Sequence, residues 1–144
     1  MYNMNNRAQM RQPFFEAWEK FQTKQPLSDL EQQLLQVIIE HPEYHYLFQD
    51  PEKYKDKDFS AESGETNPYM HFGVHLAIRD QVSMHLPLGI REVFEKLCEQ
   101  QGSKLEAEHR MIECFSNALW QAMQSGEAFN NDEYLRACRE LLGL

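Results

Sequence analysis

Apolar residues recur along the chain with the spacing of amphipathic helices. The first such segment, residues 12–24, carries an aromatic stripe: Phe14, Phe15, Trp18 and Phe21. Pro13 fits best at the first helical position, because a proline inside a helix removes a hydrogen bond and clashes with the preceding turn. We therefore expect a helix from residue 12 and treat residues 1–11 as a candidate flexible arm. The stripe is predicted to be core, with an oligomer interface as the alternative.

Capping signals divide the rest of the chain into further helices. Ser28 with Glu31 and Ser103 with Glu106 have the spacing of capping boxes. Asn67-Pro68 has the form of a cap followed by a first-turn proline. These signals predict helices over residues 28–41, 43–48, 67–85, 90–101 and 103–126, and a last one opened by Asn131-Asp132. Residues 49–66 form one long irregular loop, and no strand pattern occurs. The sequence predicts an all-α, single-domain bundle of five or six helices over residues 1–144, with the short segment of residues 43–48 not counted among them.

Composition narrows the classes of partner. The 144 residues carry a formal charge of −9, which repels a phosphate backbone and disfavours a nucleic-acid partner. No apolar run approaches the ~18 residues that span a bilayer, and the N-terminus lacks a signal-peptide pattern, so we expect neither a membrane partner nor secretion. Cys98, Cys114 and Cys138 show no C-x-x-C spacing and suit a reducing, cytoplasmic compartment. No phosphate loop or G-x-G-x-x-G occurs, so no nucleotide cofactor is expected.

The candidate chemistry lies in the six histidines. Two pairs have i, i+4 spacing, which places both members on one helix face: His41 with His45, and His71 with His75. His109 has Glu113 four residues after it and Glu106 three residues before it. These are three candidate two-ligand units.

Helical projection predicts which faces these units occupy. His71 and His75 lie within the apolar stripe of residues 67–85, and Arg79 lies at its edge one turn later. On the helix over 103–126 we expect a core stripe, with His109 on its shoulder and Glu113 and Glu106 further round on that side. That stripe consists of Leu105, Ile112, Leu119 and Met123. Both units are therefore predicted to point inward or toward a groove.

The first hypothesis is a metal site. Two imidazoles one turn apart can chelate one ion, and a histidine with a carboxylate from a facing helix can complete the ligand set. The predicted ligands are His71, His75, His109 and Glu113. His41 and His45 form a candidate second set, and Arg79 and Glu106 would support the ligands or bind an anion. This inventory suits Fe, Mn or Zn.

Other interpretations stay open. The histidines could be core residues satisfied by hydrogen bonds in a non-enzymatic helical protein that binds a protein partner or its own copies. A third hypothesis is a pocket for an unidentified small molecule, in which His75 and Arg79 hold a carboxylate without metal. Pro42 disfavours the helical conformation at His41, so His41 suits a cap better than a helical ligand. Whether the protein is an enzyme is not predicted.

Several motifs resemble a small family of uncharacterised proteobacterial proteins, catalogued only as a domain of unknown function. The motifs are His41-Pro-Glu-Tyr-His45, Asn67-Pro-Tyr-Met-His71-Phe-Gly-Val-His75-Leu-Ala-Ile78, Gly89-Ile90, Glu108-His109 with Glu113-Cys114, and Ala118-Leu-Trp120. The resemblance extends from about Arg7 to Leu142 and departs at Pro13, where the family has an aromatic residue. It implies a bacterial, cytoplasmic, single-domain protein and brings no assigned activity.

Overall fold

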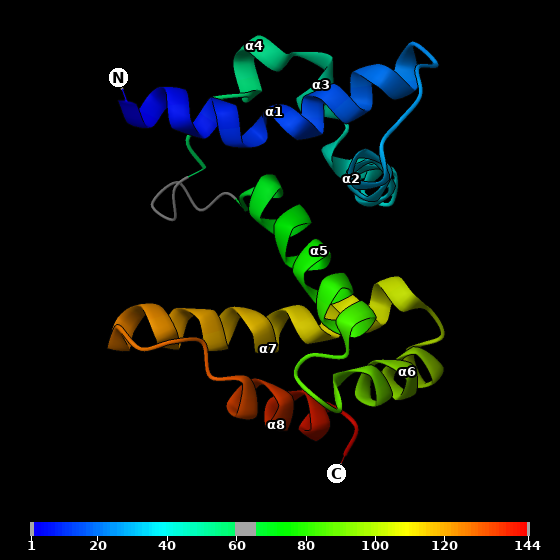
Figure 1. Ribbon diagram of the computed structural model, residues 1–144, viewed down its shortest axis with the longest axis vertical. Helices are drawn as coiled ribbons and strands as arrows, with labels where there is room; N and C mark the ends of the chain where they lie inside the picture. Colours follow the sequence, from blue (N-terminus) through cyan, green and yellow to red (C-terminus); the bar gives the residue numbers. More distant parts are fainter. Residues whose placement is uncertain (1, 60–65, 144) are drawn as a thin grey trace. The chain divides into compact units, whose positions relative to one another are not determined.

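The computed structural model describes residues 2–59 and 66–143, and within these ranges the chain is helical and contains no strand. Eight α-helices and one 3-10 helix follow one another there (Figure 1): α1 Tyr2–Gln22, α2 Asp29–Ile39, η1 Pro42–Tyr44, α3 Tyr46–Gln49, α4 Pro51–Tyr54, α5 Pro68–Met84, α6 Ile90–Gln101, α7 Lys104–Ser125 and α8 Asn131–Leu141. The all-α prediction is confirmed. The predicted count of five or six is too low, because two single-turn helices, α3 and α4, occupy the part of the chain around residue 50.

The described chain divides into two compact units, Met1–Leu76 and Ala77–Leu144, and the boundary falls inside α5. The prediction of one single-domain bundle is therefore not confirmed. In the first unit α1 packs against α2. The core of this unit consists of Phe15, Val37, Ile38, Leu47, Phe48, Phe59, Tyr69 and Phe72, with Ala17, Leu34 and Leu35 beside them.

The second unit is built around three helices. α7 contacts both α6 and α8, which also contact each other (Figure 1). Its buried apolar residues come mainly from these helices: Ile90, Val93, Phe94, Leu97, Ala107, Met111, Cys114, Ala118, Tyr134, Leu135 and Cys138. This stripe on α7 differs from the predicted one. Met123, a member of the predicted stripe, is 73% exposed, whereas Met111, Cys114 and Ala118 are buried, so the helix buries a neighbouring face.

Most of the predicted capping residues lie at the ends of helices in the structure. Ser28 and Glu31 form the capping box of α2, with each side chain bonded to the other residue's backbone N–H at 3.2 and 2.9 Å. Asn67 caps α5 by accepting from the backbone N–H of Tyr69 at 3.0 Å. Ser103 accepts from the Glu106 N–H at 3.0 Å at the start of α7. The last helix is capped one residue earlier than predicted, by Asn130.

The predicted start of the first helix is wrong. α1 begins at Tyr2, so residues 2–11 are helical and Pro13 lies inside the helix. An interior proline costs about 3 kcal/mol, and side chains of the early turns offset part of this cost. The Arg11 guanidinium donates to the Lys55 and Lys57 carbonyls at 3.1 and 2.7 Å and lies 4.2 Å from the Tyr69 ring centroid.

The same contacts order much of the predicted loop. The segment of residues 49–66 contains α4, whose N-cap Asp50 accepts from the Lys53 N–H. Arg7 forms ion pairs with Asp56 and Asp58 at 3.4 and 3.7 Å. Residues 60–65 of the predicted loop lie outside the described residues.

Candidate metal centre

Helix α5 brings His71 and His75 together as predicted. Its N-terminal cap sets the register, and the two imidazoles follow one turn apart on one face. Their Nε2 atoms lie 3.2 Å apart and their ring centroids 4.8 Å apart. His75 is fully buried and His71 half-buried.

His41 is the third member of this cluster. It follows α2 with φ −126°, a conformation that ends the helix before Pro42. Its ring centroid lies 4.9 Å from that of His71 and 4.7 Å from that of His75. One ligand nitrogen of each of the three residues lies within 4.8 Å of the other two. The three rings therefore form a nearly equilateral triangle in the first unit.

A hydrogen bond to the backbone determines which ring nitrogen of His41 can bind an ion. Its Nδ1 lies 2.7 Å from the Val37 carbonyl oxygen. Because a carbonyl only accepts, Nδ1 carries the proton, and Nε2 of the neutral ring then presents a lone pair. Metal-binding histidines commonly have this arrangement, with one ring nitrogen donating to a carbonyl or carboxylate and the other binding the ion.

The spacing of the cluster is compatible with a shared ion. Two imidazole nitrogens bound to one tetrahedral Zn²⁺ at the usual distances would lie about 3.3 Å apart. The 3.2 Å between the Nε2 atoms of His71 and His75 matches this edge. The ligand nitrogen of His41 lies within 4.8 Å of the other two, so a small shift of the rings that keeps the His41 bond to Val37 would complete the set.

Aromatic side chains surround the three imidazoles. The fully buried Phe72 ring lies edge-on to His41 at 5.8 Å. Tyr44 stacks with His41 at 6.0 Å and meets the edge of His71 at 5.8 Å. Burial raises the pKa of the Tyr44 phenol, and the nearby Glu43 carboxylate adds to the effect. These walls limit water access, which strengthens the interaction between a bound ion and its ligands.

The structure does not bring His45 into the cluster. Its Nε2–H donates to the Ile38 carbonyl at 2.8 Å, and its ring packs on Trp18 at a centroid distance of 4.8 Å. The i, i+4 rule fails here because the intervening residues form a 3-10 turn rather than an α-helix. His41 and His45 therefore separate, and His41 joins the pair on α5.

The remaining predicted site residues lie in the second unit. His109 is half-buried on α7, and its Nδ1 lies 3.6 Å from a carboxylate oxygen of Glu106, which is longer than a hydrogen bond. Glu113 is exposed, contrary to the inward orientation predicted for it. The roles of His109 and Glu113 as ligands stay predictions.

Sequence reasoning missed Glu108. This residue is 4% exposed, and both of its carboxylate oxygens accept from the Arg79 guanidinium at 3.0–3.2 Å. Arg79 thus pairs with an internal carboxylate, and its predicted role in supporting the ligands or binding an anion stays a prediction. A signal was present, because Glu108 lies three residues after Leu105 and four before Ile112, on the predicted apolar stripe.

Comparison with known proteins identifies the family. A family model described as "Domain of unknown function (DUF1841)" matches residues 6–140. The chain belongs to this family. No curated protein and no solved structure matches the DUF1841 chain. Within its described residues, no helix combines the length and the apolar character needed to cross a membrane.

Proposed function

We propose that this DUF1841 protein binds a divalent transition metal through His41, His71 and His75. The observation that carries the proposal is the triangle of imidazoles with centroid separations of 4.7–4.9 Å. His109 and Glu113 stay predicted ligands on their sequence spacing alone, and the proposed site does not depend on them.

The ligand chemistry ranks the candidate metals. Imidazole nitrogens suit Zn and Fe, whereas Mn prefers carboxylate and other oxygen ligands. The three central donors are all imidazoles. We therefore place Zn and Fe ahead of Mn, and a contribution from Glu113 would favour Fe or Mn.

Three protein ligands leave a coordination position for another group. A bound ion would supply a polarised water or a site for dioxygen at that position, which is the requirement for metal-dependent catalysis. The buried residues around the cluster would hold the imidazoles and exclude bulk water. We place the protein in the bacterial cytoplasm, a proposal supported by its three free cysteines.

One observation favours a second candidate function, a helical interaction protein with a structural histidine network. His41 and His45 both bond to carbonyls of α2, at Val37 and Ile38. These bonds tie the end of α2 to the following turn whether or not a metal is present. In this alternative the cluster has no ion and stabilises the core.

A metal titration distinguishes the two functions. Chelator-treated protein without a His tag would be titrated with Zn²⁺ by calorimetry and with Co²⁺ by visible absorption. We expect one tightly bound ion per chain and a tetrahedral or five-coordinate cobalt spectrum. Binding should be lost in His71→Ala and in His75→Gln, each checked for folding by circular dichroism.

His85→Ala is the matched control. His85 bonds to Glu92 at 2.8 Å and is not a member of the cluster, so this variant should bind normally. If the folded parent binds none of Zn²⁺, Co²⁺, Fe²⁺ or Mn²⁺, the metal function is wrong and the structural network stands.

A further inference from the structure

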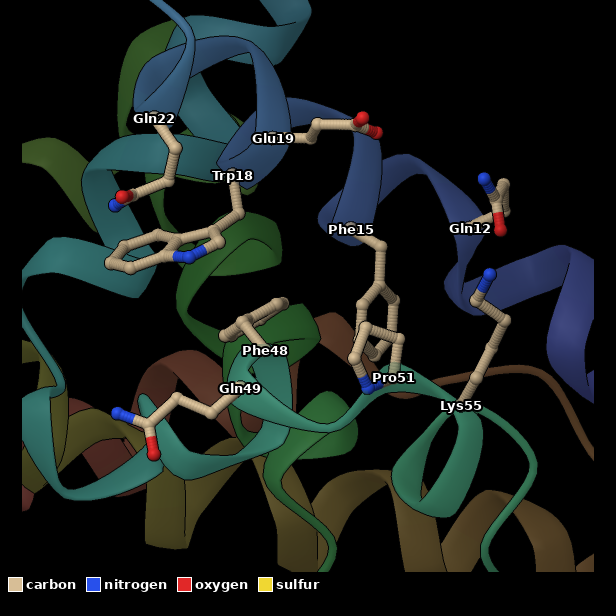
Figure 2. Close-up of a pocket in the computed structure, with 9 residues that line it drawn as sticks. All are labelled: Gln12, Phe15, Trp18, Glu19, Gln22, Phe48, Gln49, Pro51 and Lys55. Carbon is tan, nitrogen blue, oxygen red and sulfur yellow. The ribbon is translucent and has the colours of Figure 1, made fainter.

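The first unit has a groove that the histidine cluster does not use. Its volume is about 590 Å³, and α1 forms one wall while the segment of residues 48–55 forms the other (Figure 2). The lining residues are Gln12, Phe15, Trp18, Glu19, Gln22, Phe48, Gln49, Pro51 and Lys55. This volume is typical of sites for small molecules, which occupy roughly 300–1,000 Å³.

The floor of the groove is aromatic. Trp18 stacks with Phe48 at a centroid distance of 5.5 Å and an angle of 28°, and Phe15 meets Phe48 at 4.9 Å. Figure 2 shows these rings between Gln12 and Lys55 at one end and Gln22 and Gln49 at the other. Phe15 and Phe48 are each 7% exposed and hold the half-buried Trp18 ring in place, so Trp18 offers apolar surface to a ligand at little entropic cost.

A lysine lies over one end of this floor. The Lys55 Nζ is 5.4 Å from the Phe15 ring centroid. Among the described residues, no carboxylate forms an ion pair with this ammonium, in contrast to Lys20, which contacts Glu31 at 2.7 Å. The Lys55 carbonyl accepts from Arg11 at 3.1 Å, so the backbone that carries the ammonium is fixed to α1.

We propose that this groove binds a small planar aromatic molecule that carries a carboxylate. The ligand ring would stack on the half-buried Trp18, above the buried Phe15 and Phe48, and the carboxylate would pair with Lys55. Glu19, on the α1 wall, repels an anion and so directs the carboxylate toward the lysine end. The amide side chains on the rim can donate to the same carboxylate or to ring substituents.

The test uses 6-fluoro-2-naphthoate and its neutral amide as probes, with binding followed by fluorine NMR. The protein is treated with chelator first, because a carboxylate could otherwise bind a metal at the histidine cluster. Ligand binding in the groove is then tested independently of the metal function. The indole N–H signals of the two tryptophans report the location, since Trp18 lines the groove and Trp120 does not.

We expect the naphthoate to shift the Trp18 indole signal and leave that of Trp120 unchanged. Lys55→Gln should weaken naphthoate binding by about tenfold, the effect of losing one charge-assisted hydrogen bond, and leave amide binding unchanged. Glu19→Gln should strengthen naphthoate binding. Lys53→Gln removes the same charge from the neighbouring α4, outside the groove lining, and should have little effect.

Three results would each overturn the proposal. One is the absence of any shift of the Trp18 signal up to the solubility limit of the naphthoate. Another is equal binding of the naphthoate and its amide. The third is an equal loss of affinity in Lys55→Gln and Lys53→Gln, which would show a general effect of net charge.

Discussion

The two histidines of the His41-Pro-Glu-Tyr-His45 motif should respond differently to substitution. Their i, i+4 spacing predicts the same role for both. In the structure His41 belongs to the imidazole triangle, whereas His45 donates a hydrogen bond to a carbonyl of α2. We expect His41→Ala to abolish tight metal binding and His45→Ala to leave it nearly unchanged. Both variants should be less stable than the parent.

The magnitudes follow from the interactions that each substitution removes. His45→Ala removes the bond to Ile38, worth about 1 kcal/mol, together with packing on Trp18. His41→Ala removes the bond to Val37 and leaves a buried cavity, so a destabilisation of about 2–3 kcal/mol is expected. For metal affinity, removal of an outer hydrogen-bond partner typically costs 10–100-fold. Removal of the ligand His41 should therefore cost more than about 100-fold, whereas His45→Ala should stay within about threefold.

The assay pairs urea unfolding of the chelator-treated proteins with Co²⁺ titration under conditions where each variant is folded. Unfolding measures the structural cost of each substitution separately from metal affinity. Equal losses of Co²⁺ affinity in the two variants would refute the separate roles of His41 and His45. Loss of binding in His45→Ala with binding retained in His41→Ala would refute them as well.

Three further predictions concern other parts of the chain. Arg79→Met strands the buried carboxylate of Glu108 and should lower the free energy of unfolding at pH 7 by about 3 kcal/mol, whereas Arg136→Met, which removes ion pairs exposed to solvent, should cost much less; equal losses in urea unfolding would contradict this. Burial raises the pKa of Tyr69 to about 12 from 10.0, so the folded state keeps this proton longer than the unfolded state, and stability should fall as pH rises from 10 to 12. Tyr69→Phe should flatten that fall, by at most about 1.4 kcal/mol per pH unit, in unfolding measured across this range. His109→Ala should weaken Co²⁺ binding by at least about tenfold if the ligand role predicted from the sequence spacing holds, and an unchanged affinity would remove His109 from the ligand set.

Local signals explain the parts of the fold and site that the sequence predicts well. The Ser28 capping box and the Asn67 cap depend only on residues within one turn, and both occur as expected. The pairing of His71 with His75 follows from α-helical geometry once the helix is established. Such features need no knowledge of which helices are neighbours.

The remaining features depend on contacts between distant segments or on non-α geometry. Pro13 lies inside α1, and the same helix is held by hydrogen bonds from Arg11 to carbonyls more than 40 residues away in the sequence. His41 and His45 do not share a helix face because η1 is a 3-10 turn. The contact of His41 with His75 on α5 is a tertiary one. The charge of Glu108 argued against burial in the sequence, and its pairing with Arg79, which makes the buried position tolerable, is a tertiary contact.

Elemental analysis of the untagged protein, purified without chelator, tests the proposed metal function most directly. We predict near-stoichiometric Zn or Fe in the parent and loss of that metal in the folded His71→Ala plus His75→Ala variant. A parent that contains no metal, and takes up none when it is supplied, would contradict the metal function and make the imidazole triangle a structural element of the core.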